Sequence, residues 1–579
     1  MPRLFQLAIV FAVALLLTSS LARATAPASP AAVAYQHGLE ALKKGDLASA
    51  RIAFEKAVRL SPTDAAAQAS LGWVLAQQRE FDAASAHLKT AIRLRPAFAS
   101  ARMTLAGILT QQRKAPEAEQ QLRAAIKSEP NNAEAHRMLG RTLSHQNLEE
   151  ATSELRRAAE LAPQRPDFQD DLGSALAQQK RNTEATAAFS EALRLQPDFA
   201  LAHFHLGAVH LEQQELEQAA RELSKAADLA PRDATSHFYL SKAFAGQSKP
   251  VDALRELRTT VELKPDWFDA QIALGLACQR APELDCAVAA FEAATKLHPQ
   301  DPEAFNDLGL ALIQKGAAEQ AVPEFRTATR LRPEDASFRA NLGIAFLQRA
   351  DFDSAITEFE AAIRLAPDDS PTHYNLGLAY KLKDQLDKAI AELLKAIELK
   401  PDLADAHYTL GVLYWQQGEF DKAADQLRAA IQSEPNYAEA HYTLGTVLKQ
   451  QSKLPEAAAS LREALRLQPD FAGAHTTLAA VLRLQGDAAG AAEEAKAASS
   501  ITANTTNLQA AEFSTNSGKR LLDTGDLDAA IAQFRAAIQA SETYAPAHRQ
   551  LAQALQQQGH TDEAAKELRR ATELESSPK

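Results

Sequence analysis

The chain has 579 residues, with 62 Lys and Arg against 74 Asp and Glu, and its formal net charge is −12. The two signs are interspersed, and no basic block or face occurs. Proteins that bind nucleic acid or an anionic membrane surface need concentrated Lys and Arg. We therefore expect neither partner. A chain of this length normally forms several domains, unless an internal repeat makes it one long array.

The first 26 residues differ in composition from everything after them. An apolar stretch at 7–17 is followed by Ala-Arg-Ala at 22–24 and Ala-Thr-Ala at 24–26, and either triplet suits signal peptidase. This pattern predicts a secretory signal over 1–26 and a short linker over 27–30. An uncleaved anchor is the alternative, but it needs about 20 apolar residues. We expect an exported protein, periplasmic or secreted from a bacterial cell envelope, with no membrane span after cleavage.

From residue 31 the chain repeats itself. Residues 404–437 are one clear copy, and we number positions within every copy from 1 at the equivalent of Ala404. Position 20 is Ala in all sixteen copies, position 27 is Ala in all but one, and position 8 is always Gly, Ala or Ser. Position 32 is proline in most copies, at Pro62, Pro96, Pro130, Pro163, Pro197, Pro231, Pro265, Pro299, Pro333, Pro367, Pro401, Pro435 and Pro469.

Each copy predicts a helical hairpin. In 404–437, apolar residues at helical spacing end at Gly418, and a second amphipathic segment then runs to Pro435. We call the two segments helix A and helix B. The small residues at positions 8, 20 and 27 fit helices that cross at about 8–10 Å. One hairpin cannot bury its apolar face, so the copies must stack.

These recurring positions resemble the tetratricopeptide repeat (TPR) family. The resemblance implies an all-α, right-handed superhelical α-solenoid of tandem antiparallel helix pairs. It divides the chain into fourteen repeats over 31–505, a linker or hinge at 506–510, and two C-terminal repeats with a polar capping end over 511–579. The array is one elongated domain rather than several.

The fourteenth copy departs from the pattern. It has Ala495 where Leu or Phe is usual, and a Ser, Thr and Asn-rich stretch follows at 499–507. Less apolar area and a polar connector predict the weakest junction of the array here. Elsewhere, acidic or amide residues directly after the prolines are expected to cap the next helix A; these are Asn131, Asp198, Asp266, Asp402 and Asp470.

The two cysteines, Cys278 and Cys286, occupy positions 11 and 19 of the eighth repeat. These positions are nearly equidistant from the turn between helices A and B, so their side chains can meet. In an oxidising compartment they can form a disulfide. Two small buried thiols are the alternative.

Motifs for catalysis or phosphate binding are not found, and the carboxylates have the spacing of solvated helix faces. Histidine recurs at position 4, but equivalent residues of successive repeats lie about 10 Å apart, too far to share a zinc ion. We expect these side chains to pack between repeats. We expect no enzyme activity, no cofactor and no metal. The position-4 histidines are His136, His203, His237, His373, His407, His441, His475 and His548.

The resemblance implies that helices A line a concave groove, and that positions 2, 5, 6, 9, 12 and 13 reach a bound segment. In repeats eight to thirteen several of these positions are apolar or aromatic, as is typical of binding surfaces. Partial burial between neighbouring helices A is the alternative for position 9. The candidate groove residues are Leu276, Leu310, Ile313, Ile344, Leu347, Tyr374, Leu378, Tyr408, Val412, Trp415 and Tyr442.

In repeats four and five the same face carries charge, so the groove is expected to offer a second chemistry there. The charged residues are Glu134, Arg137, Arg141, Asp167, Asp170 and Asp171.

Together these features predict a non-enzymatic protein–protein interaction scaffold of the cell envelope that binds a peptide or partner protein. An accessory subunit of envelope polysaccharide synthesis or secretion is an alternative, and a hydrolase or transferase using dispersed carboxylates is a third. The repeats also resemble the TPR region of O-linked N-acetylglucosamine transferases. Their asparagine ladder at position 6 is nearly missing, because only Asn341 and Asn375 are adjacent.

Overall fold

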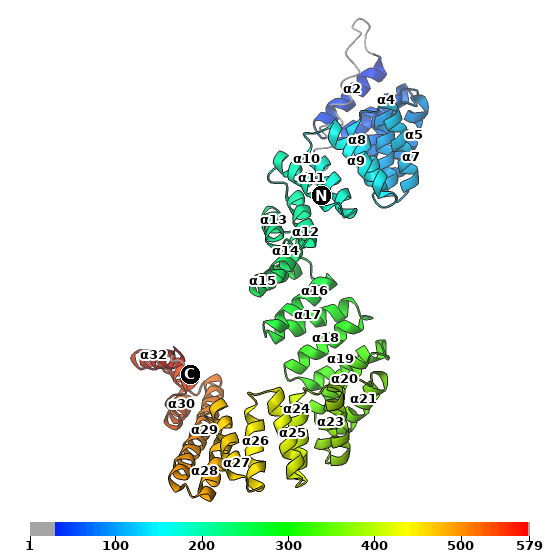
Figure 1. Cartoon of the computed structure of the whole chain (residues 1–579). Coiled ribbons are helices and arrows are strands. Elements are labelled where there is room, and N and C mark those ends of the chain that lie inside the picture. Colours follow the sequence, from blue (N-terminus) through cyan, green and yellow to red (C-terminus); the bar gives the residue numbers. More distant parts are fainter. Residues whose placement is uncertain (1–28, 577–579) are drawn as a thin grey trace. The chain divides into compact units, whose positions relative to one another are not determined.

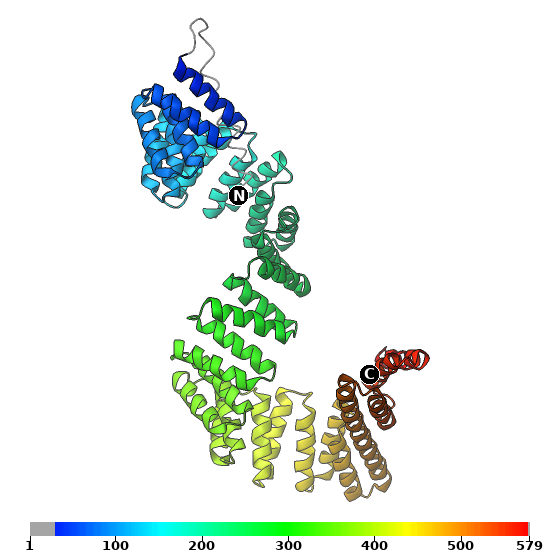
Figure 2. The same ribbon diagram turned by 180° about the vertical axis from the view of Figure 1, so that it is seen from behind.

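The computed structural model describes residues 29–576, which form 31 α-helices and no strand. The predicted signal over 1–26 lies outside these residues. The helices divide into two units, and the boundary in the sequence lies between His298 and Pro299. Consecutive helices pair as antiparallel hairpins and stack on the next pair within each unit (Figures 1 and 2). The predicted all-α solenoid of tandem helix pairs is therefore confirmed.

The first unit contains repeats one to eight. Its A helices are α2 (Pro30–Lys43), α4 (Ala65–Gln77), α6 (Ala99–Gln111), α8 (Ala133–Leu143), α10 (Pro166–Gln178), α12 (Ala200–Glu212), α14 (Ala234–Gly246) and α16 (Phe268–Arg280). Its B helices are α3 (Leu47–Leu60), α5 (Phe81–Leu94), α7 (Ala115–Ser128), α9 (Leu148–Leu161), α11 (Asn182–Leu195), α13 (Leu216–Leu229), α15 (Pro250–Leu263) and α17 (Leu284–Leu297). Ser29 caps α2, so the array begins within the expected 27–30 linker.

The second unit contains repeats nine to sixteen. Its A helices are α18 (Pro302–Gln314), α20 (Ala336–Gln348), α22 (Ser370–Leu382), α24 (Ala404–Gln416), α26 (Ala438–Gln450), α28 (Ala472–Gln485) and α31 (Ala545–Gln558). Its B helices are α19 (Ala318–Leu331), α21 (Phe352–Leu365), α23 (Leu386–Leu399), α25 (Phe420–Ser433), α27 (Leu454–Leu467), α30 (Leu527–Ala540) and α32 (Thr561–Ser576). The remaining helix, α29 (Ala488–Asp523), has 36 residues and belongs to two repeats.

Helix α29 corrects the prediction of a linker at 506–510, because those residues lie inside it. It serves as helix B of repeat fourteen and continues without a turn into helix A of repeat fifteen. Each of the other hairpins is separated from the next by a turn, and this turn contains a proline after repeats one to thirteen. The connector here has no such helix stop, and its Ser, Thr and Asn side chains can bond to backbone carbonyls four residues back, as Thr502, Thr505 and Thr506 do.

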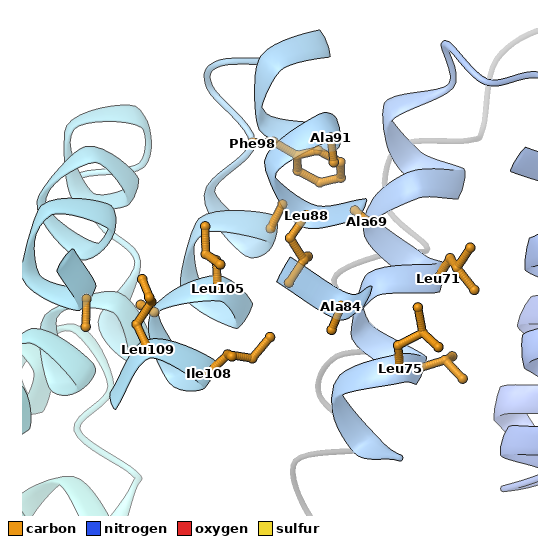
Figure 3. Packing of buried hydrophobic residues seen from close by; sticks show 14 of the residues in the cluster. Ala69, Leu71, Leu75, Ala84, Leu88, Ala91, Phe98, Leu105, Ile108 and Leu109 are labelled. Carbon is orange, nitrogen blue, oxygen red and sulfur yellow. The ribbon is translucent and has the colours of Figure 1, made fainter. Parts of the chain in front are cut away.

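In the hairpins with glycine at position 8, a close contact between positions 8 and 24 packs helix A against helix B. A Cβ added to Gly72 would lie 2.7 Å from Leu88 Cγ, and one added to Gly309 would lie 2.5 Å from Phe325 Cε1. Leu88 and Phe325 are fully buried. Leu88 also belongs to a core cluster that includes residues of the following helix A. The core therefore continues from α4 and α5 into α6 (Figure 3).

The N-caps of helices A lie at position 34, one residue after the positions we expected. Asp64, Asn132, Asp233, Asp301, Asp335 and Asp369 accept hydrogen bonds from the first free amides of the next helix. The prediction that Asn131, Asp198, Asp266, Asp402 and Asp470 would do so was wrong. Where position 34 is instead aromatic, as at Tyr437 and Phe471, the helix starts without a side-chain cap.

Candidate functional site

Helices A approach one another more closely than helices B do within each unit. Direct contacts join α4 with α6, α10 with α12, α18 with α20 and α24 with α26, whereas neighbouring B helices are joined mainly through the A helix between them. In a curved stack, the row whose members come closer together lies on the inner side. Position 5 of one helix A meets position 6 of the next, as the 3.2 Å hydrogen bond between the hydroxyls of Tyr35 and Ser70 shows.

The eleven candidate groove residues are all half-buried. Ten of them lie on helices α18 to α26 of the second unit, and Leu276 lies on α16 of the first. Partial burial is what position 9 would show if it packed between neighbouring helices A, and it also leaves part of every side chain open to solvent. These residues therefore combine a fixed position with an available apolar surface.

Aromatic side chains gather where repeat twelve meets its neighbours. The rings of Tyr408 and Tyr437 lie 5.0 Å apart, centroid to centroid, and the Tyr437 hydroxyl donates a hydrogen bond to the Asp405 carboxylate at 3.1 Å. Burial and this carboxylate raise the pKa of Tyr437. Burial also raises the pKa of Tyr374, whose hydroxyl bonds Thr409. Both phenols thus stay neutral and able to donate hydrogen bonds at any physiological pH.

A second pair extends this aromatic surface by one repeat. The rings of Tyr442 and Phe471 lie 4.7 Å apart. Phe471 and Tyr437 both occupy position 34, and each packs on the position-5 tyrosine of its own repeat. Sequence reasoning singled out Tyr408 and Tyr442 but missed these partners. Their signal was an aromatic residue at the position where other repeats carry the capping Asp or Asn.

Asp307 on α18 is a further residue that sequence reasoning missed. It occupies position 6 and is half-buried. Burial, with the nearby Asp301 and Glu303 carboxylates, raises the pKa of Asp307 to about 6. Beside it the Asn341 amide donates a hydrogen bond to the Asn306 side-chain oxygen at 2.8 Å. The helix A face of repeat nine therefore carries a carboxyl that changes charge near neutral pH.

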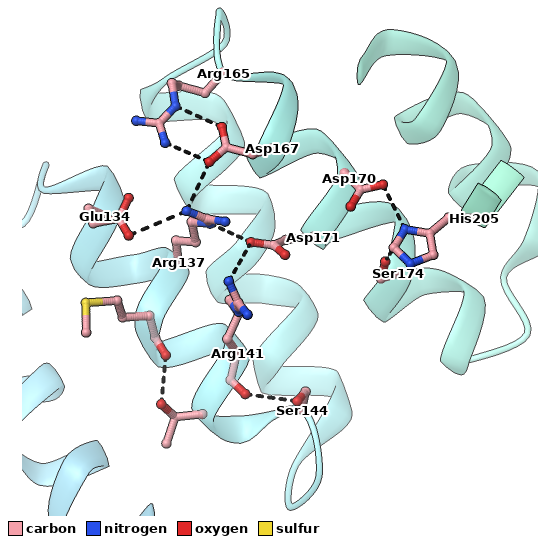
Figure 4. A network of polar contacts seen from close by, with 12 residues as sticks. Glu134, Arg137, Arg141, Ser144, Arg165, Asp167, Asp170, Asp171, Ser174 and His205 are labelled. Carbon is pink, nitrogen blue, oxygen red and sulfur yellow. Dashed lines mark hydrogen bonds and ion pairs between the residues drawn. The ribbon is translucent and has the colours of Figure 1, made fainter. Parts of the chain in front are cut away.

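The charged residues of repeats four and five pair with one another (Figure 4). The Arg137 guanidinium contacts the carboxylates of Asp171 at 2.5 Å, Asp167 at 3.0 Å and Glu134 at 3.6 Å. Arg165 also contacts Asp167, at 2.7 Å. Burial opposes the charge of Arg137, but the carboxylates outweigh it and raise its pKa. Burial likewise opposes the charge of Asp167, but Arg165 and Arg137 lower its pKa.

A separate polar group joins repeats five and six, where His205 Nδ1 lies 2.9 Å from Asp170 and 3.3 Å from the Ser174 hydroxyl (Figure 4). These side chains join neighbouring helices A, while Arg141 and Glu134 keep 62% and 42% of their side-chain area exposed. A charged second chemistry in this stretch stays a prediction.

The position-4 side chains tie three segments together. In His373, Nε2 donates to the Pro367 carbonyl at 3.0 Å, and Nδ1 lies 2.6 Å from the Glu392 carboxylate of helix B. His136, His203, His237, His475 and His548 make the same two kinds of contact. These histidines lie between repeats, as expected. Their contacts are hydrogen bonds to a carbonyl of the preceding repeat and to a carboxylate of helix B.

The two cysteines are joined by a disulfide, with their Cα atoms 5.8 Å apart. The bond links α16 to α17 across the turn. Glu283 lies within 4.8 Å of both sulfurs, but its carboxylate already pairs with Arg258. We assign no metal to this group.

None of the helices within residues 29–576 combines the length and the apolar character needed to cross a membrane.

Comparison with known proteins gives family models described as tetratricopeptide repeat. One matches residues 35–99, 238–302, 283–336, 306–370, 408–462 and 442–504, and others match 75–142, 521–577 and 358–391. A further model, described as TPR repeat, matches 173–214 and 379–418. No curated protein matches the chain.

Several solved structures are similar to parts of the chain. A structure of the APC/C hetero-tetramer Cut9-Hcn1 is 18% identical, with 72% of this chain and 96% of that one covered and a TM-score of 0.36. YrrB, a TPR protein with an unusual peptide-binding site, is 24% identical, with 32% and 97% covered and a TM-score of 0.30. MamA from Desulfovibrio magneticus RS-1 is 26% identical, with 29% and 96% covered and a TM-score of 0.28.

TM-scores this low carry no argument about function, so the family assignment rests on the family models. Those models span more than half of the residues, and they recur at the repeat spacing seen in the sequence. The chain belongs to the tetratricopeptide repeat family.

Proposed function

We propose that this protein is a non-enzymatic interaction scaffold of the cell envelope, and that it holds an extended peptide or partner protein on the helix A face of its second unit. The TPR fold is typical of protein–protein interaction. The observation that carries the proposal is the tyrosine cluster of repeats eleven to thirteen. It places phenol rings and hydroxyls among half-exposed aliphatic side chains on neighbouring A helices.

The physical reason lies in what these side chains offer a partner. Tyr and Trp bury large areas at little cost in conformational entropy, and they dominate the binding energy of many interfaces. The rings of Tyr408 and Tyr437 already contact each other, and Tyr408 and Trp415 both pack against the buried core of repeats twelve to fourteen. A bound segment would therefore meet a surface whose side chains are largely ordered beforehand.

The envelope location rests on the apolar stretch and cleavage triplets of the first 26 residues. Cell fractionation of the producing organism tests it directly. Recovery of the protein from the periplasmic or secreted fraction supports the proposal, and recovery from the cytosol contradicts it.

The groove is tested by partner capture. Immobilised protein is exposed to an envelope extract of the producing organism, and the captured proteins are identified by mass spectrometry. Tyr408→Ala with Trp415→Ala should lower capture of a specific partner at least about tenfold, because truncating interface aromatics typically costs 2 kcal/mol or more. The circular dichroism spectrum should be unchanged.

Tyr414→Ala is the matched control. Tyr414 is a half-buried aromatic on the same helix α24, but it lies under the Lys422 ammonium of α25 instead of on the proposed face. Its loss should leave capture intact. Equal losses with both variants would show that helix stability, and not the proposed face, governs capture.

A further inference from the structure

The exposed fraction of the side chain at position 3 shows whether helix A of a repeat packs against the preceding repeat. This residue is at most 5% exposed in repeats two to fourteen and in repeat sixteen. It packs on the position-27 alanine of the preceding repeat, as Ala135 does on Ala125 and Ala547 on Ala537. Two copies break the rule. Val33 of repeat one is 41% exposed, and Phe513 of repeat fifteen is 71% exposed.

Repeat fourteen lacks the usual contact with the repeat that follows it. Position 24 is at most 5% exposed in repeats one to thirteen and in repeat fifteen. In repeat fourteen this position is Ala495, which is exposed. A hollow of about 780 Å³ opens there between α28 and α29, lined by Ala479, Ala480, Arg483, Ala498 and Thr502 among others. Only Leu568 of repeat sixteen, which has no described repeat after it, is comparably exposed at this position, at 51%.

The straight course of α29 explains both exposures. In every other junction the chain turns between helix B and the next helix A, so that position 3 folds back onto position 27. Here residues 511–523 continue along the axis of helix B and are carried away from Ala498. We call the uncovered side of residues 511–523, which includes Phe513 near its N-terminal end, the tail face. The hollow and the tail face are the two halves of one ordinary repeat–repeat contact.

The charges of the two halves are also complementary. Across a normal junction, a position on one helix A meets the next higher position on the following helix A. Arg137 and Asp171 are paired in this way, as are Asn306 and Asn341. By the same register Arg483, at position 12 beside the hollow, would meet Asp523, at position 13 on the tail face. Neither has an ion-pair partner among the described residues.

We propose that the hollow and the tail face form an interface between two copies of this chain. Residues 511–523 of one copy occupy the hollow of the other, and the exchange is reciprocal, so a single twofold contact covers both halves. The occupant comes from a second copy because the continuous helix holds the hollow and the tail face of one chain apart. Its chemistry is defined by the hollow: a helix with an apolar residue at position 3 and an acidic residue at position 13.

The test is the molar mass of the purified chain, measured by light scattering over a hundredfold range of concentration. We expect a dimer whose dissociation constant rises at least about tenfold in Phe513→Ser, which removes the ring, and in Ala498→Glu, which puts a charge into the hollow. Val33→Ser is the matched control, because it alters the other exposed position 3, and it should leave the dimer unchanged.

A charge exchange separates a direct contact from a loss of folding. Arg483→Asp alone and Asp523→Arg alone should each weaken the dimer, and the two changes combined should restore it. A mass of one chain at every concentration would overturn the inference. So would a double variant no better than the single ones.

A cysteine pair distinguishes exchange between copies from bending within one. Copies with Ala498→Cys are mixed with copies with Phe513→Cys under oxidising conditions, and the expected product is a covalent mixed dimer. A chain that carries both changes and closes a disulfide within itself, while the mixture gives no dimer, would show that α29 bends back onto its own hollow and would refute the proposal.

Discussion

Gly309→Ala tests the close contact between positions 8 and 24, which recurs in the hairpins with glycine at position 8. The new Cβ would lie 2.5 Å from Phe325 Cε1 and 2.7 Å from Cζ, where normal contacts are about 3.4–4 Å. The phenyl ring is fully buried and cannot swing into solvent. Overpacking of this kind costs about 1–3 kcal/mol, while replacing a helical glycine by alanine returns about 1 kcal/mol. We expect a net destabilisation of about 1 kcal/mol.

Gly107→Ala is the matched control. Gly107 also lies inside a helix A, but a Cβ there would meet nothing nearer than Met138 Cε at 3.9 Å. Only the helix preference acts, so this variant should be more stable by about 1 kcal/mol. The two variants should thus differ by about 2 kcal/mol, or about thirtyfold in the local opening constant.

Hydrogen exchange read by mass spectrometry is the suitable assay, because a long repeat array does not unfold as one cooperative unit. Faster exchange is expected in α18 and α19 of Gly309→Ala, and slower exchange in α6 of Gly107→Ala. Phe325→Leu should rescue Gly309→Ala, because natural copies combine Ala106 with Leu122. Equal protection from hydrogen exchange in Gly309→Ala and Gly107→Ala would contradict a close contact between positions 8 and 24.

Three further changes test other features. His373→Ala should lower the free energy of local opening near Pro367 by about 1–2 kcal/mol and so speed amide exchange there, since two hydrogen bonds are lost. His373→Gln should keep the hydrogen bond to the Pro367 carbonyl, as Gln271 keeps the bond to the Pro265 carbonyl. The raised pKa of Asp307 means that its contribution to stability is present below about pH 4 and lost as pH rises through about 6. Asp307→Asn should remove this dependence and stabilise α18 at pH 7.5 by about 1 kcal/mol after allowance for solvent screening; an unchanged pH profile of exchange would contradict this. Thiol titration should find two groups only after reduction, and Cys278→Ser should cost about 2–3 kcal/mol locally; free thiols in the unreduced protein would disprove the bond.

The fold could be predicted because the same residue pattern recurs in sixteen copies. Alanine at position 20 and a small residue at position 8 mark the same helix contact in every copy, so a chance match is excluded by repetition. The predicted N-cap positions were wrong by one residue, because neighbouring positions carry the same residue types. Both positions 33 and 34 are often Asp or Asn, and only the backbone shows that position 34 directly precedes the helix.

The site was harder to predict, because contacts across a junction depend on partners about 35 residues away. Arg137 and Asp171 look like two exposed charges until stacking brings them to 2.5 Å. Tyr437 was hidden at a capping position, and its role emerges only when its ring lies on Tyr408. The linker prediction was wrong for a different reason. Its Ser, Thr and Asn residues are typical of a connector, but here they lie inside a helix.

The pairing of glycine at position 8 with phenylalanine at position 24, found in six hairpins, bears on how such an array can grow. All six copies with phenylalanine at position 24 carry glycine at position 8, whereas alanine or serine at position 8 never faces phenylalanine. A gene duplication that copies a whole 34-residue block keeps both members of the pair. Unequal crossing-over within a hairpin, between a copy with Ala106 and one with Phe325, would unite a methyl group with a ring that has no room for it. Selection should therefore tolerate recombination junctions between hairpins and remove many that fall within them.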